Sequence, residues 1–214
     1  GHVTERARQR ALVRLGYDAI SLAYRSDDGD AAASSAEDVS RYSGWMAELA
    51  GLLRPGARVV DLGCGAGIPA TRELAGHGLQ VLGVDFSAVQ LHRAQRLVPA
   101  ARFVQADMSA LQLRPASADA VAAFYSLIHL PVADQQALFP RIRDWLRPGG
   151  DFLAIVGAGQ WTGTAPYLGA DMFWDHADTA TYLRWLQESQ LTPLWNRYIP
   201  EGNSGHTLVL AQTS

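Results

Sequence analysis

The chain has 214 residues, of which 48% are hydrophobic and 18% charged, and its formal net charge is −3. This length and apolar content predict one packed domain, with or without a helical extension, and exclude a disordered chain. All 18 basic residues are Arg, which excludes enzymes that depend on a P-loop lysine or a Schiff-base lysine. The slightly acidic balance argues against nucleic-acid binding, which needs a basic face.

The sequence favours a cytoplasmic location over export or membrane insertion. No leader-like segment opens the chain, and the longest uncharged stretch, 152–170, is interrupted by four Gly and one Pro. The single cysteine, Cys64, cannot form an internal disulfide, which is typical of a reducing compartment.

In chain order, the pattern begins with two helices. Apolar residues recur at intervals of three and four between residues 4 and 24, and a second helix is expected from about Ala36 to Leu53, where Arg54-Pro55-Gly56 ends it. The segment 26–35 between them is rich in Asp, Gly, Ala and Ser and predicts a loop.

From residue 58 onward, short apolar strands alternate with helices of about ten residues. Strands are expected at 58–62, 80–85, 101–106, 118–125 and 150–156, and helices at 69–76, 87–97 and 134–146. This alternation predicts an α/β fold with a doubly wound, Rossmann-like, mostly parallel sheet that is covered on both faces.

The last part of the chain departs from that alternation. The 22-residue connection at 157–178 is too long for a simple link, so we expect a lid loop there. A helix at 179–189 follows, with Asp178 as its N-cap. Two strands at 194–199 and 207–212, joined by a Gly-containing loop, predict a closing antiparallel hairpin.

A glycine-rich loop, Asp61-Leu-Gly63-Cys64-Gly65-Ala-Gly67, joins the first strand to its helix. Glycines at this junction let a ligand approach the backbone, and the following helix, with Pro69 as its first residue, offers unpaired N–H groups to an anion. Dinucleotide enzymes use a similar turn, so the loop alone does not identify the ligand.

Three carboxylates near strand ends narrow the choice of ligand. Asp85 ends the second strand, where a carboxylate can accept both ribose hydroxyls. Asp107-Met108 ends the third, where the carboxylate and the next N–H can bind the edge of adenine. Asp61, expected inside the loop itself, would repel a pyrophosphate and suit an ammonium group. S-adenosylmethionine carries adenosine, an ammonium and a carboxylate, without a phosphate.

Four segments in this order resemble the motif series of the class I S-adenosylmethionine-dependent methyltransferases: Val59-Val-Asp-Leu-Gly-Cys-Gly-Ala-Gly67, Val81-Leu-Gly-Val-Asp-Phe-Ser87, Gln105-Ala-Asp-Met108 and Leu146-Arg-Pro-Gly-Gly150. The segment 17–24 is similar to the family's N-terminal capping helix, and the closing hairpin is similar to its reversed last strand.

The resemblance implies the positions of the cofactor contacts. Asp61 and the loop would hold the amino-acid tail, the second and third strand ends the ribose and adenine, Phe124 and Tyr125 the region near the sulfonium, and two cap tyrosines would reach over from above. The implied cofactor-binding residues are Tyr17, Tyr24, Asp61, Gly63, Cys64, Gly65, Gly67, Asp85, Phe86, Ala106, Asp107, Met108, Phe124, Tyr125 and His129.

Several of these residues have a plain structural alternative. Phe86 and Phe124 could be core aromatics at strand ends, and Tyr17 and Tyr24, seven residues apart, could share one buried helix face. Cys64 reads as an unreactive small residue rather than a nucleophile.

His129 and Tyr125, just after the fourth strand, are the candidate catalytic residues. A general base helps when the acceptor is a hydroxyl or a protonated amine and is unnecessary for a ready nucleophile. His129 could equally hold the backbone or line the pocket.

The aromatics and histidines of the last third are the candidate substrate-binding residues: Trp161, Tyr167, Phe173, Trp174, His176 and His206. Covering the sheet edge is an equally good interpretation of the aromatics. A metal site from His176, His206, Glu201 and Asp178 matches no standard spacing, so we predict none. Loop hydrogen bonding, or facing the substrate, suits Glu201 and His206 better.

These observations predict a single methyltransferase domain over 1–214, with an N-terminal helical cap at 4–53 and a core at 54–214 that carries the 157–178 lid loop. The expected activity is transfer of a methyl group from S-adenosylmethionine to O, N or S of a small molecule. A nicotinamide-dependent oxidoreductase and a non-methylating S-adenosylmethionine-binding protein are the alternatives. A monomer or homodimer is expected, without nucleic acid, membrane or metal.

Overall fold

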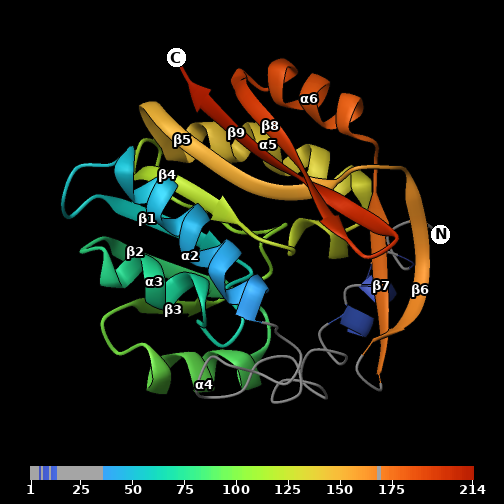
Figure 1. Cartoon of the computed structure of the whole chain (residues 1–214), viewed down its shortest axis with the longest axis horizontal. Coiled ribbons are helices and arrows are strands. Elements are labelled where there is room, and N and C mark those ends of the chain that lie inside the picture. Colours follow the sequence, from blue (N-terminus) through green and yellow to red (C-terminus); the bar gives the residue numbers. More distant parts are fainter. Residues whose placement is uncertain (1–4, 6, 10, 14–35, 168–169) are drawn as a thin grey trace.

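The computed structural model describes residues 5, 7–9, 11–13, 36–167 and 170–214. Its centre is a seven-stranded sheet in the order β3-β2-β1-β4-β5-β9-β8 (Figure 1). The strands are β1 (Arg58–Leu62), β2 (Gln80–Asp85), β3 (Arg102–Gln105), β4 (Ala118–Ala123), β5 (Leu146–Gly157), β8 (Leu191–Glu201) and β9 (Ser204–Thr213). Strands β1 to β5 pair in parallel, whereas β9 pairs antiparallel with both β5 and β8. The predicted doubly wound sheet with an antiparallel end is confirmed.

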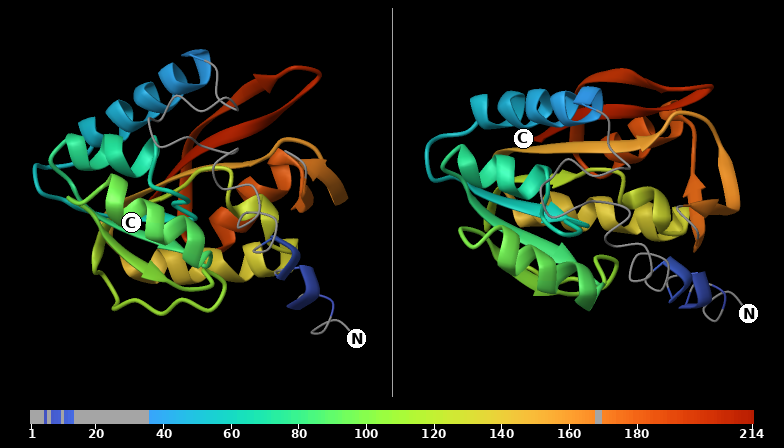
Figure 2. Two further views of the ribbon diagram at one scale, coloured as in Figure 1. Left: turned by 90° about the horizontal axis from the view of Figure 1, so that it is seen from below. Right: turned by 60° about the horizontal axis from the view of Figure 1, so that its bottom comes forward.

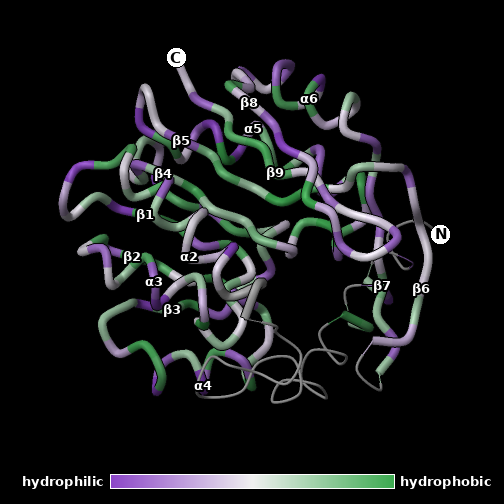
Figure 3. Tube along the Cα trace, viewed as in Figure 1, coloured by the Kyte–Doolittle hydropathy of each residue, from purple (hydrophilic) through white to green (hydrophobic). Residues whose placement is uncertain are grey.

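Helices cover both faces of the sheet (Figure 2). The helices are α2 (Ala36–Gly51), α3 (Ala70–Gly76), α4 (Ala88–Leu97), η1 (Leu127–His129), α5 (Val132–Trp145) and α6 (Thr179–Glu188). Apolar residues of α5 and α6 pack on one face and those of α2 and α3 on the other. Successive residues of a strand point to opposite faces of the sheet. In β5, Phe152 packs in the core with α5 and α6, and Leu153 packs in the core with α2 and α3. Strand segments that are buried on both faces are apolar, as Figure 3 shows in green for the central parts of β5 and β9.

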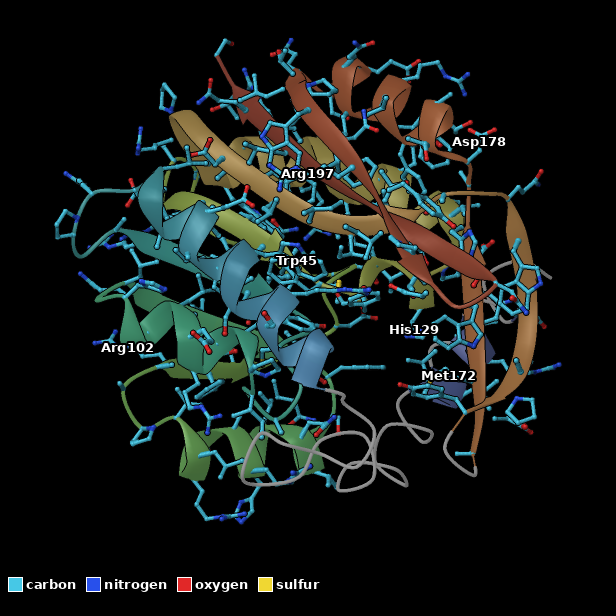
Figure 4. The ribbon with its side chains drawn as sticks, viewed as in Figure 1. Trp45, Arg102, His129, Met172, Asp178 and Arg197 are labelled. Carbon is cyan, nitrogen blue, oxygen red and sulfur yellow. The ribbon has the colours of Figure 1, made fainter. Side chains whose placement is uncertain are left out.

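Local polar contacts define several ends of these elements. Ser87 Oγ accepts a hydrogen bond from Gln90 N at the start of α4, and the Asp178 carboxylate accepts one from Thr181 N at the start of α6. The second of these is the predicted N-cap. On β8, the Arg197 guanidinium binds both carboxylate oxygens of Glu48, at 2.7 and 3.0 Å, and so ties α2 to the far end of the sheet (Figure 4).

The N-terminal cap lies only partly within the described residues. Residues 5, 7–9 and 11–13 are helical, as expected for the first helix. Residues 14–35, with Tyr17 and Tyr24, lie outside the described part of the chain. The second predicted helix is present as α2 and ends two residues earlier than expected, at Gly51.

The prediction that residues 157–178 form a loop was wrong. The segment contains the antiparallel strands β6 (Trp161–Tyr167) and β7 (Ala170–His176). Asp175 accepts hydrogen bonds from Val132 N at the start of α5 (2.8 Å) and from Thr162 Oγ1 (2.6 Å), and its carbonyl accepts one from Gln135 Nε2. Buried polar groups are costly unless paired, so these bonds fix the β6–β7 hairpin to the core.

Candidate active site

A pocket of about 900 Å³, its open mouth included, lies at the carboxyl ends of β1 to β4. Ligands of open α/β sheets bind at this edge. Twelve of the predicted site residues line it: Asp61, Gly63, Cys64, Gly65, Asp85, Phe86, Ala106, Asp107, Met108, Phe124, Tyr125 and His129. Nine further residues do so as well: Val13, Tyr42, Ala66, Ile68, Pro69, Ala70, Gln90, Ser126 and Leu130.

Asp85 is held in a fixed orientation at the end of β2. Its two carboxylate oxygens accept hydrogen bonds from Gly65 N and Ser87 N, each at 2.9 Å. Only 8% of the residue is exposed, so little water competes for these bonds. The carboxylate therefore joins the glycine loop to the start of α4 and faces the same pocket as both.

Asp61 belongs to β1, the strand predicted at 58–62, and stands just before the glycines of the loop. Thr71 Oγ1 donates a hydrogen bond to it at 2.7 Å, and the residue is 2% exposed. Burial, and more weakly the neighbouring Asp85 carboxylate, raises the pKa of Asp61 to about 7, although the Thr71 hydrogen bond opposes the shift. A cationic ligand group beside this buried carboxyl would stabilise its charged form.

The glycine loop combines structural and pocket-facing positions. Gly63 has φ +73°, and a Cβ there would lie 2.3 Å from the Ser126 Cβ, so only glycine fits beside the turn after β4. Gly65 also has positive φ, and a Cβ there would meet only Gln90 Nε2, at 3.6 Å. Gly67 does not line the pocket. It packs against Val98, just after α4, and its place beside the ligand stays a prediction.

Asp107 and Cys64 also line the pocket. Asp107 Oδ1 accepts hydrogen bonds from the N–H and hydroxyl of Ser109, at 2.9 and 2.7 Å, which orients it after β3. Burial, followed by the nearby Asp85 and Asp61 carboxylates, raises the pKa of the Cys64 thiol well above its usual value. A protonated thiol is a poor nucleophile, which agrees with the structural interpretation of Cys64.

His129 lies in η1, next to β7 (Figure 4). Its Nδ1 is 2.7 Å from the Phe173 carbonyl, which can only accept, so Nδ1 carries the proton and Nε2 does not. The Trp174 ring packs against the imidazole at 4.4 Å. Burial lowers the pKa of His129 to about 4, which outweighs the raising effect of the Phe173 hydrogen bond. His129 is therefore neutral at physiological pH and a weak proton acceptor.

Tyr125 is the point where the pocket meets the closing hairpin. It has φ +55°, an uncommon conformation for a bulky residue that often marks functional sites. Its hydroxyl donates to Glu201 Oε1 at 2.5 Å, and His206 Nδ1 lies 2.8 Å from Glu201 Oε2. The two hydrogen bonds lower the pKa of Glu201, although its burial opposes this.

The candidate substrate-binding residues are more dispersed than predicted. Trp161, Tyr167, Phe173, Trp174, His176 and His206 do not line the pocket. Trp174 and Phe173 stand behind His129, and His206 stands behind Tyr125 with its ring 5.3 Å away. Trp161 is 41% exposed on β6. Phe173, Trp174 and His206 therefore support the pocket wall from behind, through His129 and Tyr125.

Some lining residues were missed by the sequence reasoning. Gln90 lies three residues after the N-cap of α4, a position that a search of the first helical turn after each strand could have found. Tyr42 of α2 and Val13 carry no such signal, because nothing in the pattern of either helix distinguishes a pocket residue from a core residue. Among the described residues, no group of three or more His, Cys, Asp or Glu could hold a metal ion.

The donor set tests which ligand the site fits. Three carboxylates, those of Asp61, Asp85 and Asp107, face the pocket, and no Arg is among the described residues that line it. A pyrophosphate would lie beside these carboxylates without a basic side chain to offset their charge, whereas a cationic nucleoside with ribose hydroxyls and a free adenine edge meets complementary groups. Within the described ranges, no helix is both long and apolar enough to cross a membrane.

The fold and this pocket define a doubly wound α/β protein whose pocket suits a phosphate-free nucleoside. Residues 59–150 match the family model described as a methyltransferase domain. Trans-aconitate 2-methyltransferase of Paracidovorax citrulli is 43% identical over 101 residues, covering 46% of this chain and 38% of that protein. Over these residues the chain is similar to class I S-adenosylmethionine-dependent methyltransferases.

Solved structures show the same fold over most of the chain. The 1,6-didemethyltoxoflavin-N1-methyltransferase of Burkholderia thailandensis, with 1,6-didemethyltoxoflavin and S-adenosylhomocysteine bound, has a TM-score of 0.69 and 22% identity, and covers 94% of this chain and 88% of that chain. The cyclase SpnF has a TM-score of 0.74 and 20% identity, with 93% and 94% covered. The chain spans only about a third to a half of the length of the curated relatives it matches.

Proposed function

We propose that this chain transfers a methyl group from S-adenosylmethionine to O, N or S of a small-molecule acceptor. The observation that carries the proposal is the convergence of Asp61, Asp85 and Asp107, from three neighbouring strands, on one pocket without a basic side chain among the described residues. The methyltransferase domain match over 59–150 supports it.

Different residues of the pocket would bind different parts of the ligand. Asp61 would bind the ammonium group, Asp85 the ribose hydroxyls, and Asp107 with the N–H of Met108 the adenine edge. Gly63 and Gly65 would let the amino-acid tail approach the loop backbone. When bound, the cofactor supplies an electrophilic methyl group on a sulfonium centre.

The protein contributes mainly position and a dry, cation-binding environment. Tyr42, Phe124 and Tyr125 form an aromatic wall whose ring centroids are 6.0 Å apart for Tyr42–Phe124 and 6.2 Å apart for Tyr42–Tyr125. Aromatic faces attract cations and exclude water. We assign His129 a wall role, with its unprotonated Nε2 as a hydrogen-bond acceptor, because its Nδ1 is bonded to the Phe173 carbonyl and its ring packs against Trp174.

One alternative keeps the cofactor but not the transfer. In this alternative, the chain binds S-adenosylmethionine without transferring its methyl group. The fold does occur in a protein that is named as a cyclase and not as a methyltransferase. A nicotinamide-dependent oxidoreductase fits less well, because a dinucleotide would place its pyrophosphate beside Asp61.

Calorimetric titration with S-adenosylhomocysteine and with NAD tests the ligand, and mass detection of released S-adenosylhomocysteine over an acceptor panel tests the transfer. We expect binding of the nucleoside sulfur compound but not of NAD, and acceptor-dependent release of product. Preference for NAD would refute the proposal. Cofactor binding without product over phenols, N-heterocycles, carboxylic acids and thiols would favour the non-methylating alternative.

We further propose a cytoplasmic location, which the single cysteine supports, and a monomer or homodimer without nucleic-acid partners. Light scattering after size exclusion would report the oligomeric state.

A further inference from the structure

Tyr125, Glu201 and His206 come from distant parts of the chain and meet beside the pocket. Tyr125 follows β4, whereas Glu201 ends β8 and His206 lies on β9, in the hairpin whose tip extends toward β7 (Figure 1). His206 pairs in register with Gly157 of β5, and a Cβ on Gly157 would collide with the His176 side chain. The His176 and His206 rings lie 6.0 Å apart, and the His206 ring lies 5.3 Å from that of Tyr125.

The hydrogen bonds of this cluster fix where the proton of the Tyr125 hydroxyl points. Glu201 accepts from Tyr125 at one carboxylate oxygen and meets His206 Nδ1 at the other. A phenol has one proton, and that of Tyr125 points to Glu201. Any hydroxyl group that meets the Tyr125 oxygen from the pocket must therefore donate to it.

We propose that Tyr125, positioned by Glu201 and His206, accepts the proton of an aromatic hydroxyl group on the methyl acceptor. This inference rests on the proposed methyl transfer and adds the acceptor class and the group that removes its proton. The aromatic class follows from the rings of Tyr42, Phe124 and Tyr125 on this wall. The hydroxyl follows from the direction of the Tyr125 hydrogen bond.

The proton balance is complete within the site. As the acceptor oxygen bonds to the methyl carbon and the carbon–sulfur bond breaks, the acceptor proton passes to the Tyr125 oxygen and the Tyr125 proton passes to Glu201. The sulfur keeps the electron pair of the broken bond. Glu201, whose side chain is 30% exposed, then releases the proton to water. The first transfer is between two phenols of similar intrinsic acidity.

The first experiment measures binding without turnover. Protein labelled with ¹³Cζ-tyrosine and ¹⁵N-histidine is loaded with S-adenosylhomocysteine and titrated with phenol or with anisole, which lacks the O–H. Phenol should shift the Tyr125 and His206 resonances, assigned through Tyr125→Phe and His206→Asn, and anisole should not. Equal shifts with both probes, or none with phenol, would overturn the proposal.

The second experiment uses phenol as acceptor. Tyr125→Phe and Glu201→Gln should each lower kcat about 100-fold while the affinity for S-adenosylhomocysteine stays within twofold. Tyr198→Phe, an exposed tyrosine on the same hairpin, is the matched control and should keep full activity. Phenol that is bound but not methylated by the unaltered protein, or variants that keep kcat, would also overturn the proposal.

The pH profile separates a chemical role from a structural one. The loss in both variants should shrink at high pH, where phenol ionises without help, whereas a packing defect would give a constant loss. His206 and Arg41 lower the pKa of Glu201, and His176 and His129 face His206. The pH profile should therefore also be measured with each of these four residues substituted. Failure of the unaltered protein to bind S-adenosylhomocysteine would instead refute the proposed function itself.

Discussion

At the residue scale, Asp85 is oriented before any ligand arrives, because Gly65 N and Ser87 N fix both of its oxygens. Asp85→Ala should weaken S-adenosylhomocysteine binding at least tenfold, since a hydrogen bond to a charged group contributes about 1.5 kcal/mol or more. Calorimetric titration measures this, with circular dichroism to verify folding. Unchanged affinity would contradict the ribose assignment.

Asp61 should make cofactor binding depend on pH. Its pKa of about 7 in the empty pocket must fall when an ammonium group binds, so binding near pH 6 releases a proton. Affinity should therefore rise as the pH increases from 6 to 7. Calorimetry in two buffers of different ionisation enthalpy reports the released proton, and Asp61→Asn should abolish its release. Buffer-independent heats at pH 6 would refute the raised pKa.

At the element scale, Asp175 links the β6–β7 hairpin to α5 through Val132 N. Asp175→Ala removes the charged acceptor of the Val132 N–H and the Thr162 hydroxyl and should destabilise the protein by about 1–3 kcal/mol. Asp171→Ala, on the exposed face of the same hairpin, is the matched control. Hydrogen exchange should accelerate over 161–176 in the first variant alone. Equal exchange in both would show that apolar packing, not Asp175, holds the hairpin.

The sequence predicted the elements that are defined by local pattern and missed those that depend on tertiary contact. Apolar runs located the parallel strands and their helices, and the predicted N-cap Asp178 located the start of α6. The hairpin strands contain Gly163, Pro166 and Asp171, which favour turns, and they are strands because Asp175 and Phe173 bond to the core. The fourth strand ends at Ala123, two residues early, because the backbone turns at Tyr125.

At the scale of the whole molecule, the cofactor side of the pocket was predictable and the acceptor side was not. Carboxyl ends of parallel strands share one edge of the sheet, so Asp61, Asp85 and Asp107 could be brought together by counting. The contact of Tyr125 with Glu201 joins residues 76 positions apart. It depends on the order β4-β5-β9-β8 and on the register of the last hairpin, which local sequence does not specify.

Two buried groups on this pocket should give the stability of the whole protein opposing pH dependences. The pKa of Asp61 is about 7 in the fold and 3.8 in the reference state, so the folded protein binds more protons and the free energy of unfolding falls as pH rises from about 4 to 7. For His129 the values are about 4 and 6.5, so the unfolded chain binds more protons and the free energy of unfolding rises over pH 4–6.5.

Asp61→Asn removes the Asp61 contribution, which lowers the free energy of unfolding as pH rises, and leaves the His129 contribution, which increases it. Between pH 5 and 6.5 the free energy of unfolding of the variant, from urea denaturation without ligand, should increase more steeply than that of the unaltered protein. The difference in slope should be at most about 1.4 kcal/mol per pH unit. Asp144→Asn, an exposed site, should leave the slope unchanged. Parallel curves for the Asp61 variant and the unaltered protein would show that burial does not keep this carboxyl protonated.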